Sequence, residues 1–189
     1  MSVLKNVVAC WPIAALAALA ACAHSGAPLG NSPAVANGYA MVNDASGNKI
    51  GAATLMQDAT GAVRIRMHVM GLTPGAHGVH FHGVGSCVAP AFVSAGGHFN
   101  PESKHHGMNN PSGPHAGDLP NMIVDDSGNA DYDATTSRVS LTPGTNSLFD
   151  TDGSALVIHA APDDNMTDPA GNAGARIGCG AIQSGMAPG

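Results

Sequence analysis

The chain has 189 residues, the length of one domain with appendages, and a formal net charge of −6. Proteins that bind nucleic acid need a basic face for the phosphates, so this charge argues against nucleic acid as a partner. The 25 glycines and 13 prolines, with only 4% aromatic residues, indicate many turns and few helices.

The N-terminus is typical of an export signal. Lys5 is the only charged residue before Asp44, and an apolar stretch runs from Val7 to Ala21. This stretch is short for a membrane-spanning helix and has no stop-transfer flank. We therefore interpret residues 1–21 as a signal peptide.

The signal ends in the letters LAAC, residues 19–22, which resemble a bacterial lipoprotein box. This predicts lipidation of Cys22 and a lipid anchor to a membrane, with the protein in the periplasm or cell envelope. Ordinary cleavage near Cys22 without a lipid is the alternative. Removing residues 1–21 leaves 6 basic and 13 acidic side chains, a net charge of −7. Residues 22–34 are rich in Gly, Pro, Ser and Ala and are predicted to be a flexible tether, followed by a folded domain over 35–189.

The folded domain shows the alternation of β-strands. In residues 62–70, apolar side chains alternate with Arg64, Arg66 and His68, as in a half-buried strand. Similar segments between turn residues such as Thr73-Pro74-Gly75 predict eight short strands, at about 36–43, 49–56, 62–70, 78–84, 120–125, 129–136, 154–160 and 176–183. They favour an all-β antiparallel barrel or sandwich. Two long stretches, 85–118 and 161–175, lack strand character, and such loops are often functional.

Histidines in and beside these stretches suggest a two-metal site. His80 and His82 lie two apart in a predicted strand, so both can point at one ion. Further imidazoles follow at His98, His106, His115 and His159. Asp118 adds a hard oxygen ligand, which suits zinc better than reduced copper. A lone His-x-His pair is a weak signal, but the whole set is much stronger.

The cysteines form one pair once the signal peptide is removed. Cys10 leaves with the signal, and Cys22 is assigned to the lipid. Cys87 and Cys179 remain, in a compartment where disulfides persist. Two free buried thiols are the alternative.

The sequence motifs around these residues, taken in chain order, resemble those of the copper/zinc superoxide dismutases. Residues 75–82 (GAHGVHFH) are similar to the family's first copper motif, and residues 96–101 (GGHFNP), 106–107 (HG) and 115–121 (HAGDLPN) to its bridging and zinc segments. Residues 171–176 (GNAGAR) with Cys179-Gly180 resemble the C-terminal signature. The resemblance covers about residues 35–183.

This resemblance implies an eight-stranded Greek-key barrel or sandwich, with one long loop for zinc and the disulfide and another that walls the substrate channel. The implied copper ligands are His80, His82, His98 and His159. The implied zinc ligands are His98, His106, His115 and Asp118, so that His98 bridges both ions. His105 is adjacent to His106, and the family spacing favours His106 as the ligand.

The resemblance also implies roles outside the ligand sets. It joins Cys87 to Cys179 as a disulfide. It assigns Asp163 to orient the histidines His80 and His106, with Asp164 as the neighbouring candidate. Arg176 is expected to attract and orient the anionic substrate, superoxide.

The expected function is superoxide dismutase activity that protects the cell envelope, with Arg176 and His98 as catalytic residues. Copper is alternately reduced and reoxidised while superoxide becomes oxygen and hydrogen peroxide. The alternative is a non-catalytic lipoprotein that stores or delivers copper, which has no need of Arg176. A catalytically inactive interaction module should have lost ligands, and none is missing. The sequence leaves the oligomeric state open, with a homodimer as one alternative.

Overall fold

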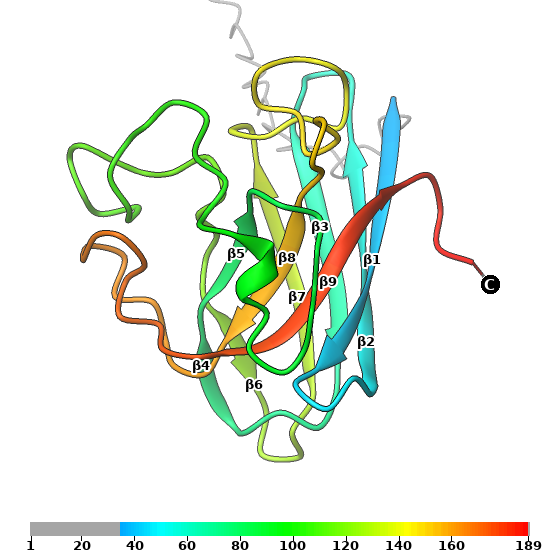
Figure 1. Cartoon of the computed structure of the whole chain (residues 1–189), viewed down its shortest axis with the longest axis vertical. Coiled ribbons are helices and arrows are strands. Elements are labelled where there is room, and N and C mark those ends of the chain that lie inside the picture. Colours follow the sequence, from blue (N-terminus) through cyan, green and yellow to red (C-terminus); the bar gives the residue numbers. More distant parts are fainter. Residues whose placement is uncertain (1–34, 189) are drawn as a thin grey trace, which may run out of the picture. The chain divides into compact units, whose positions relative to one another are not determined.

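The computed structural model describes residues 35–188 (Figure 1). The proposed signal peptide, Cys22 and the tether lie outside the described residues. Within 35–188 the regular elements are nine strands and the 3-10 helix η1 (Val93–Ala95). The strands are β1 (Ala36–Asp44), β2 (Lys49–Gln57), β3 (Val63–Val69), β4 (Gly75–His77), β5 (Val79–His82), β6 (Met122–Val124), β7 (Ala130–Thr136), β8 (Ala155–His159) and β9 (Arg176–Ser184).

Seven strands form one curled antiparallel sheet in the order β5-β8-β9-β1-β2-β3-β7, and β4 pairs with β6 in a second sheet (Figure 1). The chain crosses from β3, near one edge of the large sheet, to β5 at the other edge. The all-β fold class is confirmed. No helix in the part of the chain described here is long and apolar enough to span a membrane.

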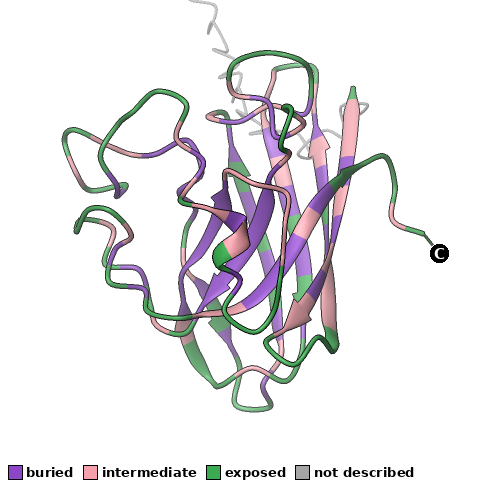
Figure 2. Ribbon diagram, viewed as in Figure 1, coloured by how far each residue is buried: buried purple, intermediate pink, exposed green. Residues whose placement is uncertain are grey.

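The core follows from the alternation in the sequence. Val63, Ile65 and Val69 on β3 are fully buried, whereas the intervening Arg64, Arg66 and His68 are half-buried or exposed. Buried and more exposed positions likewise follow one another along the strands in Figure 2. Leu55 on β2 pairs with Ile65, and both belong to the main apolar cluster. Each strand thus turns one row of side chains into the interior of the curled sheet.

All eight predicted strands are present, but strand β4 was missed. The residues Thr73-Pro74-Gly75 indicate a turn, whereas β4 begins at Gly75. Only three residues of β4 pair with β6, from Gly75 opposite Val124 to His77 opposite Met122. A strand this short, formed by a partner far along the sequence, leaves no alternating pattern to detect.

Two long connections project on the same side of the molecule, one within residues 83–121 and one over 160–175 (Figure 1). They contact each other, because the Asn109 amide donates to the Asn165 carbonyl (2.9 Å) and the His106 amide donates to Asp168 Oδ1 (2.5 Å). A third long connection, residues 137–154, joins β7 to β8 and was not singled out from the sequence.

A disulfide between Cys87 and Cys179 ties the segment after β5 to β9. Phe92 and Ala95, in and beside η1, pack with Val157 of β8 and with Cys179 in a small apolar cluster. The segment 83–97 is therefore fixed against the sheet both covalently and by packing.

Removing this disulfide is expected to destabilise the domain strongly. The bond closes a loop with a sequence separation of 92 residues. Cross-links over loops of this length lower the free energy of the folded relative to the unfolded state by about 3–5 kcal/mol. We expect the double variant C87S/C179S, compared metal-free with the oxidised protein, to unfold at a clearly lower denaturant concentration. Equal midpoints with equal denaturant dependence would contradict this prediction.

Candidate metal centre

The site is built on β5, where four successive residues are buried. Val79 and Phe81 point into the main apolar cluster, so His80 and His82 point to the other side of the strand. Strand β8 pairs with β5 and ends at His159. The long connection after β5 returns to the strand at two isolated bridges, which pair His82 with His98 and His80 with Asp118. The topology thus gathers residues that lie far apart in the sequence.

Four imidazoles form the first cluster. Ligand atoms of His80, His82, His98 and His159 all lie within 4.8 Å of one another. One nitrogen of each ring is buried and has no hydrogen-bond partner: Nδ1 of His80, and Nε2 of His82, His98 and His159. Buried polar atoms are rarely left unpaired in folded proteins. Four such nitrogens converging at one point fit a copper ion, for which imidazole is a suitable ligand.

The other nitrogen of each ring is fixed by a hydrogen bond. His82 Nδ1 donates to the Gly96 carbonyl (3.0 Å), and His159 Nδ1 donates to the Gly174 carbonyl (3.2 Å). His80 Nε2 lies 2.7 Å from a carboxylate oxygen of Asp163. These contacts set the tautomer and orientation of each ring, so the unpaired nitrogens are held as lone-pair donors toward the cluster.

The second cluster consists of His98, His106, His115 and Asp118. Asp118 Oδ1 lies 3.0 Å from Nδ1 of His98 and of His106, and 3.5 Å from Nδ1 of His115. The Nδ1 atoms of His98 and His115 are 3.4 Å apart. Ligand atoms around tetrahedral zinc, at bonds of about 2.0–2.1 Å, are separated by about 3.3 Å. The donor set and its spacing therefore fit zinc.

The two oxygens of the Asp118 carboxylate make different contacts. Its Oδ2 accepts the backbone amides of Gly107 (2.9 Å) and His115 (3.0 Å). Its Oδ1 is left facing the three imidazoles. The geometry thus presents one oxygen to a metal, as expected for a single-oxygen zinc ligand.

Asp163 lies between the two clusters and is fully buried as a side chain. Its Oδ2 is 2.7 Å from His80 Nε2, and its Oδ1 is 3.0 Å from His106 Nε2. Its neighbour Asp164 is exposed and instead accepts the backbone amides of Met166 and Thr167. The contacts to one histidine of each cluster are thus made by Asp163.

The structure gives a reason for the glycine at position 171, the first residue of the motif GNAGAR. A Cβ atom there would lie 1.8 Å from Asp163 Oδ1 and 2.7 Å from His106 Nε2, and the residue has φ +62°. Any other side chain would displace the carboxylate that orients both rings.

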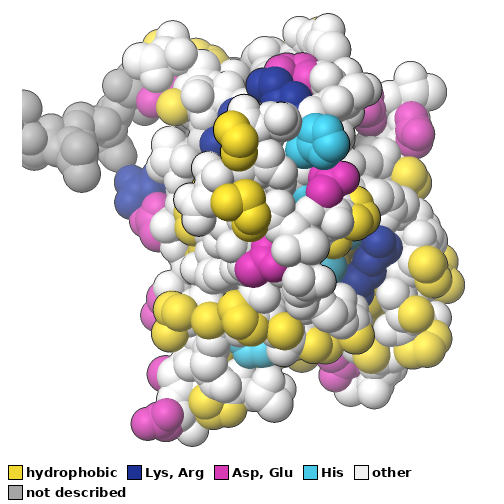
Figure 3. Space-filling model, turned by 90° about the vertical axis from the view of Figure 1, so that its left-hand side faces the viewer, with side chains coloured by type: hydrophobic (Ala, Val, Ile, Leu, Met, Phe, Trp, Pro, Cys, Tyr) yellow, Lys and Arg dark blue, Asp and Glu magenta, His cyan; other side chains and the backbone are white. Residues whose placement is uncertain are grey.

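Arg176 begins β9 beside the first cluster. Its guanidinium donates to the carbonyls of Phe92 (2.7 Å) and Gly96 (2.6 Å). The Gly96 carbonyl also accepts from the ring of His82, so Arg176 and a candidate copper ligand share one acceptor. On the side of the molecule where the two long connections project, several histidine side chains are visible at the surface. A Lys or Arg side chain lies beside one of them (Figure 3).

Burial favours the neutral form of three imidazoles in the first cluster, His82, His98 and His159. Together with the neighbouring imidazoles, it lowers the pKa of His82 to about 2, that of His159 to about 3 and that of His98 to about 4. Neutral imidazole is the form that binds metals. Burial also lowers the pKa of His106, but hydrogen bonds to Asp118 and Asp163 outweigh it and raise the pKa to about 9. Without metal, His106 therefore holds a proton at neutral pH.

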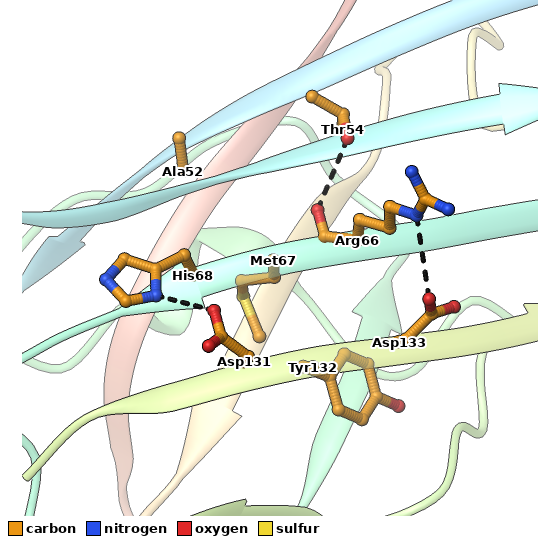
Figure 4. Close-up of a pocket in the computed structure, with 8 residues that line it drawn as sticks. All are labelled: Ala52, Thr54, Arg66, Met67, His68, Asp131, Tyr132 and Asp133. Carbon is orange, nitrogen blue, oxygen red and sulfur yellow. Dashed lines mark hydrogen bonds and ion pairs between the residues drawn. The ribbon is translucent and has the colours of Figure 1, made fainter.

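The remaining histidines of the domain lie outside both clusters. Both ring nitrogens of His77 are bonded to backbone carbonyls, those of His159 (2.7 Å) and Thr73 (2.9 Å). His105 is exposed and lies 3.6 Å from Asp168. His68 pairs with Asp131 on the outer face of the sheet, in a shallow hollow where Arg66 pairs with Asp133 (Figure 4). The polar side chains of this hollow are exposed and pair with one another, as on a solvated sheet surface.

Two contacts of the site were not anticipated from the sequence. The Asn121 side chain bonds both the amide (2.9 Å) and the carbonyl (2.8 Å) of Asp163 and so fixes its backbone. Arg138 donates to the backbone carbonyl of Asp118. Asn121 lies in the HAGDLPN motif, which could have marked it, whereas nothing in the spacing around Arg138 points to the site.

The fold and site together define a class of protein: a curled antiparallel β-sheet with two adjacent histidine-rich clusters that share His98, each of which could hold a metal ion. The family model described as copper/zinc superoxide dismutase matches residues 49–182. A Cu-Zn superoxide dismutase of Aquifex aeolicus is 48% identical over 147 residues, which cover 77% of this chain and 85% of the relative. That of Caulobacter vibrioides is 42% identical over 147 residues, with 76% and 84% covered.

Among solved structures, a mutant of a superoxide dismutase-like protein from Bacillus subtilis superposes with a TM-score of 0.74 and 43% identity, covering 76% of this chain and 95% of that chain. The chain belongs to the copper/zinc superoxide dismutase family. This is a family of oxidoreductases that use copper and zinc, and superoxide dismutation is the function that membership supports.

Proposed function

We propose that this chain carries out superoxide dismutation with copper held by His80, His82, His98 and His159, and with zinc held by His98, His106, His115 and Asp118. The observation that carries the proposal is the set of four unpaired, buried imidazole nitrogens at one point. His98 belongs to both clusters through its two ring nitrogens. The individual ligand assignments stay predictions until metal binding is measured.

Bound copper would supply the one-electron chemistry by which two superoxide ions and two protons become oxygen and hydrogen peroxide. The protein's own groups would prepare that reaction. The guanidinium of Arg176, fixed by two carbonyls, would attract and orient the anion. His98 Nε2 has no hydrogen-bond partner in the protein and could carry the single proton of the neutral ring when Nδ1 of the same ring serves as a zinc ligand.

The three carboxylates of the segment 161–175 do not act as free anions at the site. Asp163 orients two rings, Asp164 accepts backbone amides of its own loop, and Asp168 accepts the amide of His106. The positions of these carboxylates agree with a structural role, in which they orient rings and hold backbone amides. Arg176 is the cationic side chain fixed beside the first cluster.

The decisive measurement is superoxide disproportionation by the purified protein after reconstitution with copper and zinc, with metal content determined on the same sample. Fast, copper-dependent turnover at about one copper and one zinc per chain is the expected result. Full metal loading without turnover would overturn the proposal and favour copper storage or delivery.

Zinc binding is expected to release a proton. The pKa of His106 is raised to about 9 in the metal-free protein, so at pH 7 zinc must displace the proton from this ring. Zinc affinity should therefore rise roughly tenfold per pH unit between pH 6 and 8, because one bound proton competes with the metal. Calorimetry in buffers of different ionisation enthalpy would count the proton. Zinc affinity that does not change with pH would contradict the prediction.

We further propose that the protein is exported and anchored by a lipid on Cys22, so that it acts in the periplasm or cell envelope. The disulfide supports an oxidising compartment. Mass spectrometry of the mature N-terminus tests this, with C22S as the control. An unmodified N-terminus at residue 23 or beyond would contradict the anchor.

A further inference from the structure

Arg138 lies two residues after β7, in the third long connection. Its guanidinium is half-buried, and Nη2 donates to the backbone carbonyl of Asp118. Its Nε is buried and has no hydrogen-bond partner. By contrast, the side chains of Arg64 and Arg66 are 41% and 53% exposed, and both pair with Asp133 at the outer face of the sheet. Burying a guanidinium is costly, so its contact with a candidate zinc ligand needs a physical reason.

The backbone of Arg138 is itself held in place. Its amide donates to Thr136 Oγ1 (3.1 Å), and its carbonyl accepts from Asn146 Nδ2 (3.0 Å). The same Asn146 amide group donates to Glu102 Oε1 (3.0 Å), in the segment that carries His106. Hydrogen bonds thus connect residues 137–154 both with the loop that carries His106 and with the backbone carbonyl of Asp118 in the second cluster.

The Asp118 residue is fixed at two ends. Backbone amides of Gly107 and His115 bind its carboxylate Oδ2, and Arg138 binds its main-chain carbonyl. Asp118 Oδ1 lies 3.0–3.5 Å from three imidazole nitrogens, so a small rotation of the peptide would move it out of this arrangement. Groups that orient metal ligands in this way commonly change metal affinity by about 10- to 100-fold.

We propose that Arg138 is a positioning residue of the zinc site, which fixes Asp118 for metal binding from the connection between β7 and β8. This inference rests on the proposed zinc ligands. It concerns zinc affinity rather than turnover, so the two proposals can fail separately.

The test measures zinc affinity of the metal-free protein by competition with a chelator, and the absorption spectrum of cobalt bound in place of zinc. We expect R138M to weaken zinc binding by about 10- to 100-fold and to alter the cobalt spectrum. The matched control R64M removes an exposed, paired guanidinium and should bind zinc within about twofold of the original protein. Thermal unfolding of each metal-free variant shows that it is folded.

N146A provides a second test should R138M fail to fold. Asn146 touches neither cluster but holds the Arg138 carbonyl, so its loss should weaken zinc binding severalfold in the same direction. Unchanged zinc affinity and cobalt spectrum in R138M, or in N146A where only this variant folds, would overturn the inference. Equal losses in R64M and R138M would overturn it too, since they would indicate a general charge effect. Absence of zinc binding by the original protein would instead overturn the proposed ligands.

Discussion

Replacing His98 by alanine is expected to abolish turnover and to loosen both metals at once. His98 Nδ1 lies 3.0 Å from Asp118 Oδ1, whereas its Nε2 faces the first cluster without a partner. Loss of a residue that merely orients a ligand costs about 10- to 100-fold in metal affinity or activity, so loss of a shared ligand should cost at least about 100-fold in turnover. Metal content and superoxide disproportionation, measured on the same sample, check both parts.

The matched control is H105A. His105 lies next to His106 in the sequence but is exposed and outside both clusters. We expect it to retain metals and turnover. If H98A kept full activity with both metals, the shared role of His98 would be wrong. If H105A lost zinc, the choice of His106 over its neighbour His105 as the ligand would need revision.

The sequence predicted those parts of the site that depend on local strand geometry alone. His80 and His82 share a face because side chains of a strand alternate, and both indeed lie in one cluster. The grouping of His98 and His159 with them, and of His115 with His98 in the second cluster, came from the family resemblance, because these residues lie far apart in the sequence. Asp163 was placed in the same way, and it does contact His80 and His106.

Other features could not have been predicted from residue types. The carbonyls of Gly96 and Gly174 set the tautomers of His82 and His159, but every residue has a carbonyl, so no side chain marks them. Arg138 reaches Asp118 only because the connection between β7 and β8 folds back on the zinc loop, and contacts of this kind have no period in the sequence. Strand β4 was missed for the same reason, since its partner β6 lies far along the chain.

Replacing Arg176 by alanine is expected to lower the rate of superoxide disproportionation by about 10- to 100-fold without loss of metal. Fixed charges at a site can raise the rate of association with an oppositely charged substrate by about 10- to 1,000-fold. Because the segment 161–175 contains no Lys or Arg, attraction of the anion depends more on Arg176 here than on distant lysines. The rate of R176A should therefore also depend less on ionic strength, since salt screens the charge that was removed.

The control for this prediction is R66A, which removes the same charge from the outer face of the sheet, where Arg66 pairs with Asp133. We expect R66A to keep both the rate and its dependence on salt. Arg176 shares the Gly96 carbonyl with His82, so the copper absorption spectrum of R176A must be compared with that of the original protein. An unchanged spectrum with a reduced rate would assign the loss to the missing guanidinium. An unchanged rate with unchanged salt dependence would show that Arg176 has no part in attracting the substrate.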